Sequence, residues 1–474
     1  MSVMKIDPEE GDSMLAQELT NLNVSTRAEI QQEIHGVESL AIAETPELIH
    51  RSLLQFQDAI DCFSGNKSAY EDAMTAGSSF VCSDELRIRF LRADFFDPLK
   101  AAIRFLSHLQ NLMQWFGPVA LLRPLQLSDL DRDAIEFLRA GNNQILPSRD
   151  RAGRLVEVCI IDERWFEQEV ETRARVLMYT EAVIAEDVET QKNGLVLVIC
   201  ERVSPLRQPQ MTRMEEHQLI IQLKKGLPVR WSAVHICVPE GPMHKIHRAF
   251  MLLGFGQDAR VRSRLHPGFS LETQYKLLTF GINAVELPLT QSGTVKVKNQ
   301  MQWIKIRRVV EEERKRGRRF MGVLVPRVDD VLFSKGGKNH HGNHEFKCII
   351  ESLLSQDRYQ NMFSNRKDRR AVDHGQREAI RHDAILQVKA RNGRFLILDE
   401  GGWWVELSVD SGELAEKIAT SVYDHYKRLE ARKKQKKSRS DTGDFLESSL
   451  RHTQLDSSGK SGDSRCGLRA CMSS

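Results

Sequence analysis

Hydrophobic residues fall into two alternating patterns between residues 127 and 281. Continuous apolar runs predict buried strands at 155–162, 194–203 and 231–239, and a fourth strand is predicted at 259–266. Segments with apolar residues at helical spacing separate these strands, at 127–141, 173–191, 217–228, 241–254 and 271–281. This order predicts the α/β fold class, with a sheet that helices cover at least in part.

A helical hairpin is predicted upstream, at 83–117. A Ser or Asp cap precedes its first helix, and the dipeptide Asp97-Pro98 ends that helix and starts the next. Residues 1–50 carry ten acids but only two basic residues, Lys5 and Arg27. Because helical patches before residue 80 lack the residues for a core of their own, we interpret residues 1–80 as an acidic, partly helical extension.

The sequence ILPSRDRAGR at 145–154 places three arginines and an aspartate directly before the strand at 155–162. One interpretation is a solvated basic turn. The other is the entrance to a hairpin, in which Gly153 supplies the turn.

Residues 83–290 resemble the lipid-binding CRAL-TRIO family, the fold of yeast phosphatidylinositol-transfer and tocopherol-transfer proteins. The residues that carry the resemblance are Arg89, Phe90, Leu91, Arg92, Ala93, Asp97 and Ala101 in the hairpin, and Pro147, Asp150, Arg151, Gly153 and Arg154 in the loop. The chain departs from the family pattern where Cys200 and Glu201 end a strand, and where FGINAVELPLTQSG replaces a late Pro-x-x-Gly-Gly motif. No phosphoinositide-specific residue is therefore carried over.

The resemblance implies a helical pre-domain, followed by a sheet-and-helix domain with an apolar cavity for a phospholipid or isoprenoid-like lipid. It implies lipid binding, with intermembrane transfer and transient contact with an anionic membrane as further roles. The expected cavity floor is Leu195, Leu197, Ile199, Val234 and Ile236, or their strand neighbours of opposite parity. The expected gate is the amphipathic helix at 241–254, with the apolar face Met243, Ile246, Phe250 and Leu253 and with the polar flank His244, Lys245, His247 and Arg248. The alternative for this helix is an ordinary core element.

A second, small α+β domain is expected at 329–430. Two strand-like runs around Glu400-Gly401-Gly402 predict a two-stranded ribbon. The segment is similar to a domain family of unknown function common in diatom proteins, through Asp330, Val331, Leu332, Gly336, His340, Gly342, Asn343, Phe346, Gly393, Arg394, Phe395, Leu396, Trp403 and Trp404.

The main alternative to lipid binding is a scaffold or an adaptor that acts through this second domain. Its candidate contacts with nucleic acid or a protein partner are Lys335, Lys338, Arg394, Trp403 and Trp404. In the other interpretation of the Trp pair, one ring fills a small core and the other flanks the ribbon. His340, His341, His344 and Cys348 are a weaker candidate for a metal site, because Asn343 is typical of a helix cap.

The remaining segments are expected to be solvated. Together with the features above, they predict an extension at 1–80, a helical pre-domain at 81–126, a lipid-binding domain at 127–292, a basic helical linker at 293–328, the α+β domain at 329–430 and a disordered basic tail at 431–474. The basic runs at 307–319 and 428–439 could meet anionic lipid or nucleic acid, or belong to a linker. Cys471 is a candidate prenylation site, with Cys466 nearby for palmitoylation.

Several function classes have no support in the sequence. No apolar run approaches the ~18 residues of a membrane span, and the N-terminus has no secretory pattern, so a cytoplasmic protein is expected. The eight cysteines form no CxxC pair, and Cys159, Cys200 and Cys237 are expected to be buried and reduced. No catalytic motif is found, so we expect no enzyme and no cofactor beyond a bound lipid. Glu181, Glu186 and Asp187 are interpreted as ordinary residues of a helix surface. The sequence leaves the oligomeric state open.

Overall fold

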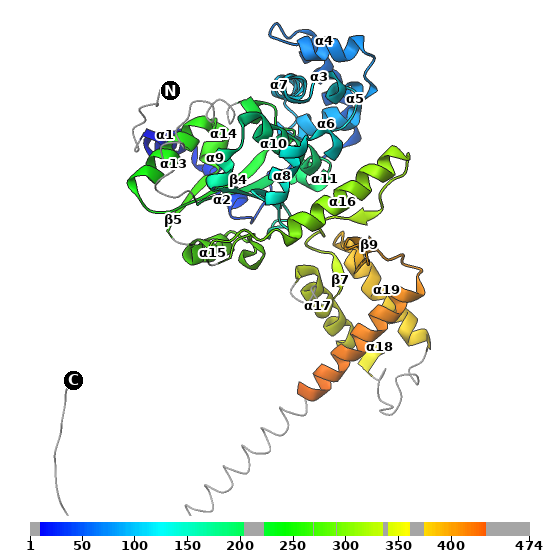
Figure 1. Ribbon diagram of the computed structural model, residues 1–474. Helices are drawn as coiled ribbons and strands as arrows, with labels where there is room; N and C mark the ends of the chain where they lie inside the picture. Colours follow the sequence, from blue (N-terminus) through cyan, green and yellow to red (C-terminus); the bar gives the residue numbers. More distant parts are fainter. Residues whose placement is uncertain are drawn as a thin grey trace, which may run out of the picture. The chain divides into compact units, whose positions relative to one another are not determined.

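The computed structural model describes residues 10–202, 222–268, 270–290, 292–334, 340–360 and 374–432 (Figure 1). The chain divides into two compact units. The first comprises Met1–Gly342 and Gly393–Glu406, and the second comprises Asn343–Asn392 and Leu407–Ser474. Both helices and sheets are present, so the predicted α/β class is confirmed at this level.

A mostly parallel sheet forms the centre of the first unit. Its strands follow the order β1 (Asn143–Ile145), β2 (Leu155–Ile161), β3 (Leu195–Glu201), β4 (Trp231–Val238) and β5 (Ser263–Pro267). Only β1 is antiparallel to its neighbour. Every residue of β2 and β3 is buried, which explains why these strands are continuously apolar in the sequence. The predictions at 155–162, 194–203 and 231–239 are confirmed. The fourth strand is shorter than predicted, because residues 257–261 form a helix.

The two faces of this sheet pack against different helices. On one face, Val156, Val158 and Ile160 pack with Ile30 and Ile34 of helix α2 (Val24–Ile34). The same core receives Leu277 and Phe280, at and just after helix α15 (Ser270–Thr279). The opposite face of β2 and β3 packs into a larger core with helix α10 (Val170–Ile184). The candidate site lies on that second face.

A helical subdomain precedes the sheet and matches the predicted hairpin at 83–117. Its helices are α3 (Pro46–Asp61), α4 (Ser68–Thr75), α5 (Ser79–Cys82), α6 (Asp84–Ala93) and α7 (Pro98–Phe116). The side chains of Ser83 and Asp97 cap α6 and α7, as expected from the sequence.

The segment 1–80 is more than an extension in this structure. Phe56 and Ile60 of α3 are fully buried in the core that α7 completes, and α3 and α4 pack on α7. Ile30 and Ile34 of α2 complete the other core. These amphipathic helices could not bury their apolar faces alone, so they depend on partners that are distant in the sequence.

The arginine-rich loop is a hairpin entrance and is not a solvated turn. Gly153 has a φ of 79°, and the Asp150 N–H donates to the Arg154 carbonyl at 2.9 Å. The Arg154 guanidinium binds the Asp150 carboxylate at 2.6 Å, and both side chains are almost fully buried. Arg154 also donates to the carbonyl of Glu33 at 2.6 Å, so the loop ties α2 to the sheet.

The remaining helices around the sheet are short. They are α1 (Glu10–Asn21), α8 (Arg132–Ala140), α9 (Glu163–Glu167), α11 (Val188–Asn193), α13 (Pro242–Gly254) and α14 (Gln257–Val261), with 3₁₀ turns at Pro118–Leu121, Leu127–Asp129 and Ala284–Glu286. Helices α1 and α13 lie side by side (Figure 1). The predicted helix at 241–254 is α13. The helix predicted at 173–191 is divided into α10 and α11. Of the helix predicted at 217–228, residues 222–225 are helical, and residues 217–221 lie outside the described part of the chain.

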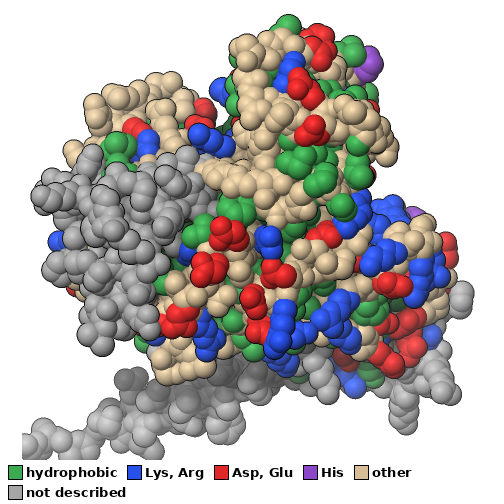
Figure 2. Space-filling model, turned by 45° about the horizontal axis from the view of Figure 1, so that its top comes forward, with side chains coloured by type: hydrophobic (Ala, Val, Ile, Leu, Met, Phe, Trp, Pro, Cys, Tyr) green, Lys and Arg blue, Asp and Glu red, His purple; other side chains and the backbone are tan. Residues whose placement is uncertain are grey.

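The predicted basic linker contains a helix that belongs to the core. Trp303 and Ile304 of α16 (Lys298–Lys315) are buried with the residues of α10. Arg307 is fully buried and binds Glu186 at 2.9 Å, and Glu186 also binds Arg314 at 2.9 Å. The basic run is thus largely neutralised by carboxylates. On the face shown in Figure 2, acidic and basic side chains are likewise interspersed.

A second sheet has the order β6 (Gly322–Val323), β9 (Trp404–Glu406), β8 (Phe395–Leu398) and β7 (Val331–Phe333). The predicted ribbon is confirmed, since β8 and β9 are antiparallel neighbours. Because β9 also pairs with β6, these strands group with the first unit. The division of the chain therefore differs from the predicted domain at 329–430.

The second unit is helical in its described residues. It contains most of α17 (His341–Ser355), then α18 (Asp357–Gln360), α19 (His374–Ala390) and a helix at 412–432. Buried residues recur at helical spacing in these helices, including Ile349 and Leu353, Ile380 and Ala384, and Leu414 and Ile418. The predicted tail at 431–474 lies outside the described residues from residue 433 onward.

Candidate ligand-binding cavity

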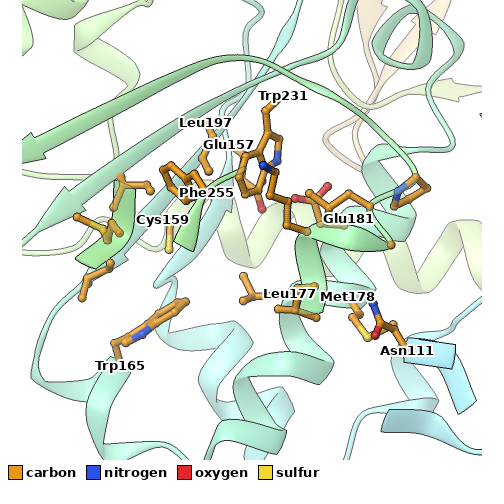
Figure 3. A pocket seen from close by; sticks show the side chains of 18 of the residues that line it. Asn111, Glu157, Cys159, Trp165, Leu177, Met178, Glu181, Leu197, Trp231 and Phe255 are labelled. Atoms are coloured by element: carbon orange, nitrogen blue, oxygen red, sulfur yellow. The ribbon is translucent and has the colours of Figure 1, made fainter. Parts of the chain in front are cut away.

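A cavity of about 120 Å³ lies on the larger-core face of the first sheet (Figure 3). Its lining comes from the sheet, from α7, α9 and α10, from residues 223–228 before β4, and from the C-terminal end of α13 with Phe255. The lining residues are His108, Asn111, Glu157, Cys159, Ile161, Trp165, Phe166, Leu177, Met178, Glu181, Leu197, Ile199, Leu223, Lys224, Gly226, Leu227, Pro228, Trp231, Met251 and Phe255. Most of these side chains are apolar, so the cavity is suited to a hydrophobic ligand. We call it the apolar cavity.

The strand residues predicted as a cavity floor divide into three groups. Leu197 and Ile199 line the apolar cavity, next to Glu157 and Cys159 of the paired strand. Val234 and Ile236 are fully buried in the same core but do not line the cavity. Leu195 packs in a separate small cluster with Ile184, Ala185 and Val229. Leu195 is the first residue of β3 and pairs with Leu155 of the same small cluster, whereas Leu197 pairs with Glu157 of the cavity.

Among the described side chains, Met251 of α13 and Phe255 directly after it contribute to the cavity wall. The side chains of Met243, Ile246 and Phe250 lie outside the described part of the structure. Leu253 is half-buried and does not line the cavity, whereas Met251 and Phe255 do. Phe255 follows the last residue of α13 and packs edge-on against Trp231, with 5.6 Å between ring centroids. The end of α13 therefore closes one side of the cavity.

Two residues of the predicted polar flank of α13 contact carboxylates. His244 is buried, and its Nδ1 contacts the carboxylate of Glu201, the residue at which the strand departs from the CRAL-TRIO pattern. Lys245 is exposed. Arg248 contacts Asp12 of helix α1. The side chain of His247 is outside the described part.

Two buried glutamates give the apolar cavity its only pair of carboxyl groups in the described lining. Glu157 of β2 and Glu181 of α10 are 2% and 6% exposed. Figure 3 shows both near Trp231, on one side of the cavity. Burial raises the pKa of Glu181 well above its usual value, and the charge of Glu157 acts in the same direction. Burial also raises the pKa of Glu157. Burial and the mutual repulsion of the two groups therefore both favour the protonated form of the pair.

Several polar atoms around this pair lie outside full hydrogen-bonding geometry with the described residues. They are Oε2 of Glu181, Nε1 of Trp231 and both amide atoms of Asn143, all buried. The indole and the amide lie close enough to the carboxyl groups to lower their pKa values in part. Unsatisfied buried polar atoms are rare in folded proteins and often mark a site that another molecule completes.

One edge of the cavity is held by polar contacts with helix α7. Nδ1 of His108 lies 2.9 Å from the Gly226 carbonyl, and the Asn111 amide donates to the Gln222 carbonyl at 3.1 Å. Burial lowers the pKa of His108 to about 4, so its ring is neutral at physiological pH. These contacts fix the segment 222–228 over the cavity.

The candidate contacts of the second domain are differently placed. Arg394 binds the buried carboxylate of Asp330 at 2.8 Å, and the Trp403 ring packs against Phe320 with 5.6 Å between centroids. Trp404 lies in β9 and is half-buried. Lys335, Lys338 and Cys471 lie outside the described residues. Among the described residues, no three side chains are grouped so that they could hold a metal ion. His340, His341, His344 and Cys348 therefore do not form the candidate metal site.

Sequence reasoning missed the two residues that give the cavity its chemistry. Glu181 was interpreted as a surface residue, but it is buried. Glu157 was read as part of an apolar strand. A signal was present in the sequence, since Glu157 stands alone in the otherwise apolar run LVEVCII. Burial of a single carboxylate in an apolar strand is costly unless the group is protonated or has a partner.

The described helices include none with both the length and the apolarity needed to cross a membrane. Comparison of the sequence with protein-family models and with curated proteins found no match in either case.

Proposed function

We propose that this protein binds a hydrophobic ligand in the apolar cavity. The observation that carries the proposal is a mostly apolar cavity with a buried pair of carboxyl groups at one side. Removal of apolar groups from water stabilises such a complex by about 0.8 kcal/mol per methylene. The resemblance to the CRAL-TRIO family supports the same function, and lipid transfer between membranes is the wider role that it suggests.

The chemistry of the glutamate pair restricts the polar end of the ligand. A pair of buried carboxyl groups whose pKa values are both raised can offer a donor as well as an acceptor from an apolar wall. A hydroxyl group fits this arrangement because it also donates and accepts. A phosphate or carboxylate would meet repulsion from the remaining negative charge. The best-supported ligand class is therefore a neutral lipid alcohol, such as an isoprenoid alcohol, with its hydroxyl at Glu157 and Glu181.

The volume of the cavity bears on how a ligand enters. A volume of about 120 Å³ suits a small apolar molecule or a short part of a longer chain. A complete lipid needs more room, of the order of several hundred Å³. The most direct enlargement is movement of the end of α13, since Met251 and Phe255 form one wall. In this proposal α13 acts as a gate, through residues near its C-terminal end.

The choice of polar end can be tested by competition. A fluorescent long-chain alcohol is bound to the full-length protein and displaced by unlabelled alcohol, fatty acid or phospholipid with the same chain length. We expect the alcohol to compete at least about tenfold better than the fatty acid at pH 7, because burying a second negative charge beside Glu157 and Glu181 costs more than 1.4 kcal/mol. Equal competition by all three would contradict the role of the glutamate pair.

A further inference from the structure

A second cavity lies beside the apolar one and has the opposite electrostatic character. Its volume is about 140 Å³, and it shares Lys224, Leu227 and Trp231 with the apolar cavity. Five cationic side chains and two carboxylates are in its lining. The cations are Lys100, Arg104, Lys224, Arg230 and Arg262, and the carboxylates are Asp94 and Asp258. We call it the cationic pocket.

The ion pairs around the cationic pocket leave an excess of positive charge. Arg104 and Asp94 neutralise each other through two hydrogen bonds of 2.7 Å. Arg230 and Arg262, in contrast, share the single buried carboxylate of Glu33, at 2.6 and 3.3 Å. One carboxylate cannot neutralise two guanidinium groups.

Arg230 is the most deeply buried cation of the pocket. Its side chain is 6% exposed, and its guanidinium lies 4.7 Å from the centre of the Phe95 ring. Nη2 binds Glu33 and the Asn193 carbonyl. Nε and Nη1 are buried and have no hydrogen-bond partner among the described residues. Buried N–H groups of a charged side chain without an acceptor are costly, and an anion in the adjoining pocket would supply the missing acceptor.

Lys224 adds a charge without a direct ion pair to the same pocket, with Asp258 and Glu18 as the carboxylates that act on it from a distance. It makes no hydrogen bond and no ion pair with any residue that the structure describes. Burial lowers the pKa of Lys224 to about 8, and the nearby charges of Arg104 and Arg260 act in the same direction against Asp258. The ammonium group is thus mostly protonated at pH 7 in spite of its cationic surroundings. Such a group is strongly stabilised by an anion.

We propose that the cationic pocket is a binding site for an anion that bears a phosphate group, with Lys224 and Arg230 as its principal contacts. A phosphate group has oxygen atoms enough to accept from both side chains, and arginine and lysine are the residues that bind it in proteins. The phosphate can belong to a soluble phosphate ester or to the head group of a lipid. Binding of an anion here does not require a ligand in the apolar cavity, although Trp231 and Lys224 line both cavities.

The test compares two neighbouring lysines in the full-length protein. Lys224→Gln removes one of the five cationic groups of the pocket, and Lys225→Gln removes an exposed charge one residue away. Binding of inorganic phosphate and of glycerol phosphate is measured by calorimetry. Sedimentation with phosphatidylcholine vesicles, with and without phosphatidic acid, tests the lipid head group. Lys100→Gln, at an exposed lining residue, is a second pocket variant should Lys224→Gln fail to fold.

We expect Lys224→Gln to weaken binding by about tenfold or more, the loss typical of one charge-assisted hydrogen bond, and Lys225→Gln to have little effect. The affinity should also fall as the pH rises above about 8, where Lys224 loses its proton. Binding to phosphate or glycerol phosphate identifies a soluble ligand, and binding only to phosphatidic acid vesicles identifies a head group. The proposal is overturned if no probe binds, or if both lysine variants bind alike.

Discussion

Two carboxyl groups set the chemistry of the apolar cavity at the scale of single residues. Glu157 lies in strand β2 and Glu181 in helix α10, and the two side chains meet only when α10 packs on the sheet. Each is buried in an apolar wall, where the neutral acid is favoured over the carboxylate. The raised pKa of Glu181 has a consequence for stability that can be measured without any ligand.

Substitution of Glu181 by Gln should make the stability of the protein less sensitive to a rise in pH above 4.5. The folded state keeps a proton on Glu181 that the unfolded state releases above its usual pKa of 4.5. The wild type therefore loses up to about 1.4 kcal/mol of unfolding free energy per pH unit between 4.5 and the raised pKa. Glu181→Gln resembles the protonated acid and lacks the loss due to Glu181, so only the smaller loss due to Glu157 remains. Urea unfolding at several pH values, followed by tryptophan fluorescence, measures the difference.

A matched variant, Glu186→Gln, should show the opposite trend. Burial raises the pKa of Glu186, but Arg307 and Arg314 together outweigh burial and hold the pKa below its usual value. This group thus stabilises the fold above its unfolded pKa, and the contribution is lost as the pH falls through the lowered pKa. Glu186→Gln should cost most stability at neutral pH and least in acid. Parallel pH profiles for the two variants would contradict the account of both sites.

At the scale of elements, the feature with the clearest consequence is the contact of α1 with α13 and α14. Glu18 of α1 binds Arg260 of α14 at 2.7 Å, and both side chains are mostly buried. The same guanidinium donates to the carbonyl of Leu252 at 3.2 Å and contacts the carbonyl of Phe255. Arg260 therefore links the acidic helix to the end of α13 that forms the cavity wall. We call this arrangement the Arg260 clamp.

Weakening of the Arg260 clamp should loosen the end of α13. In the variant Glu18→Gln we expect amide hydrogen exchange at residues 251–255 to increase several-fold, since a partly buried ion pair contributes on the order of 1 kcal/mol to local stability. In the wild type, high salt should also increase exchange at residues 251–255, but by less than Glu18→Gln does, because salt only screens the ion pair. Glu38→Gln, at an exposed residue, serves as the control. Unchanged exchange at 251–255 in Glu18→Gln would show that α1 does not restrain the gate.

The sequence was a good guide to elements whose pattern is local. Strands β2, β3 and β4 are continuously apolar because both faces of a parallel sheet are covered, and caps such as Ser83 and Asp97 mark helix starts. The sequence was a poor guide where an element depends on contacts with residues that are far away in the sequence. Strand β1 has only three residues, and α16 looks like a basic linker until Arg307 is paired with Glu186.

The candidate site was harder to predict than the fold. The parity of a strand that is apolar at every position does not reveal which side chains face a cavity. Leu197 and Ile199 line it, while Leu195, of the same parity at the start of β3, packs in a separate cluster. Glu181 becomes a cavity residue only when α10 packs on the sheet.

At the scale of the whole molecule, the two units contribute differently to the account. The apolar cavity, the cationic pocket and all six tryptophans lie in the first unit. Tryptophan fluorescence therefore reports on the unit that holds both sites. The proposed function rests on this unit alone, and the scaffold or adaptor alternative gains no support from Arg394, whose charge is neutralised by Asp330.

The most direct test of the central claim is native mass spectrometry of the purified full-length protein, with extraction and identification of any bound lipid. The matched variant is Leu197→Trp, which fills the cavity from its floor. We predict a stoichiometric neutral lipid in the wild type, either as purified or after incubation with mixed vesicles, and its loss in a folded Leu197→Trp protein. A wild type that stays empty after incubation, or a variant that retains the lipid, would contradict the claim that this cavity binds a hydrophobic ligand.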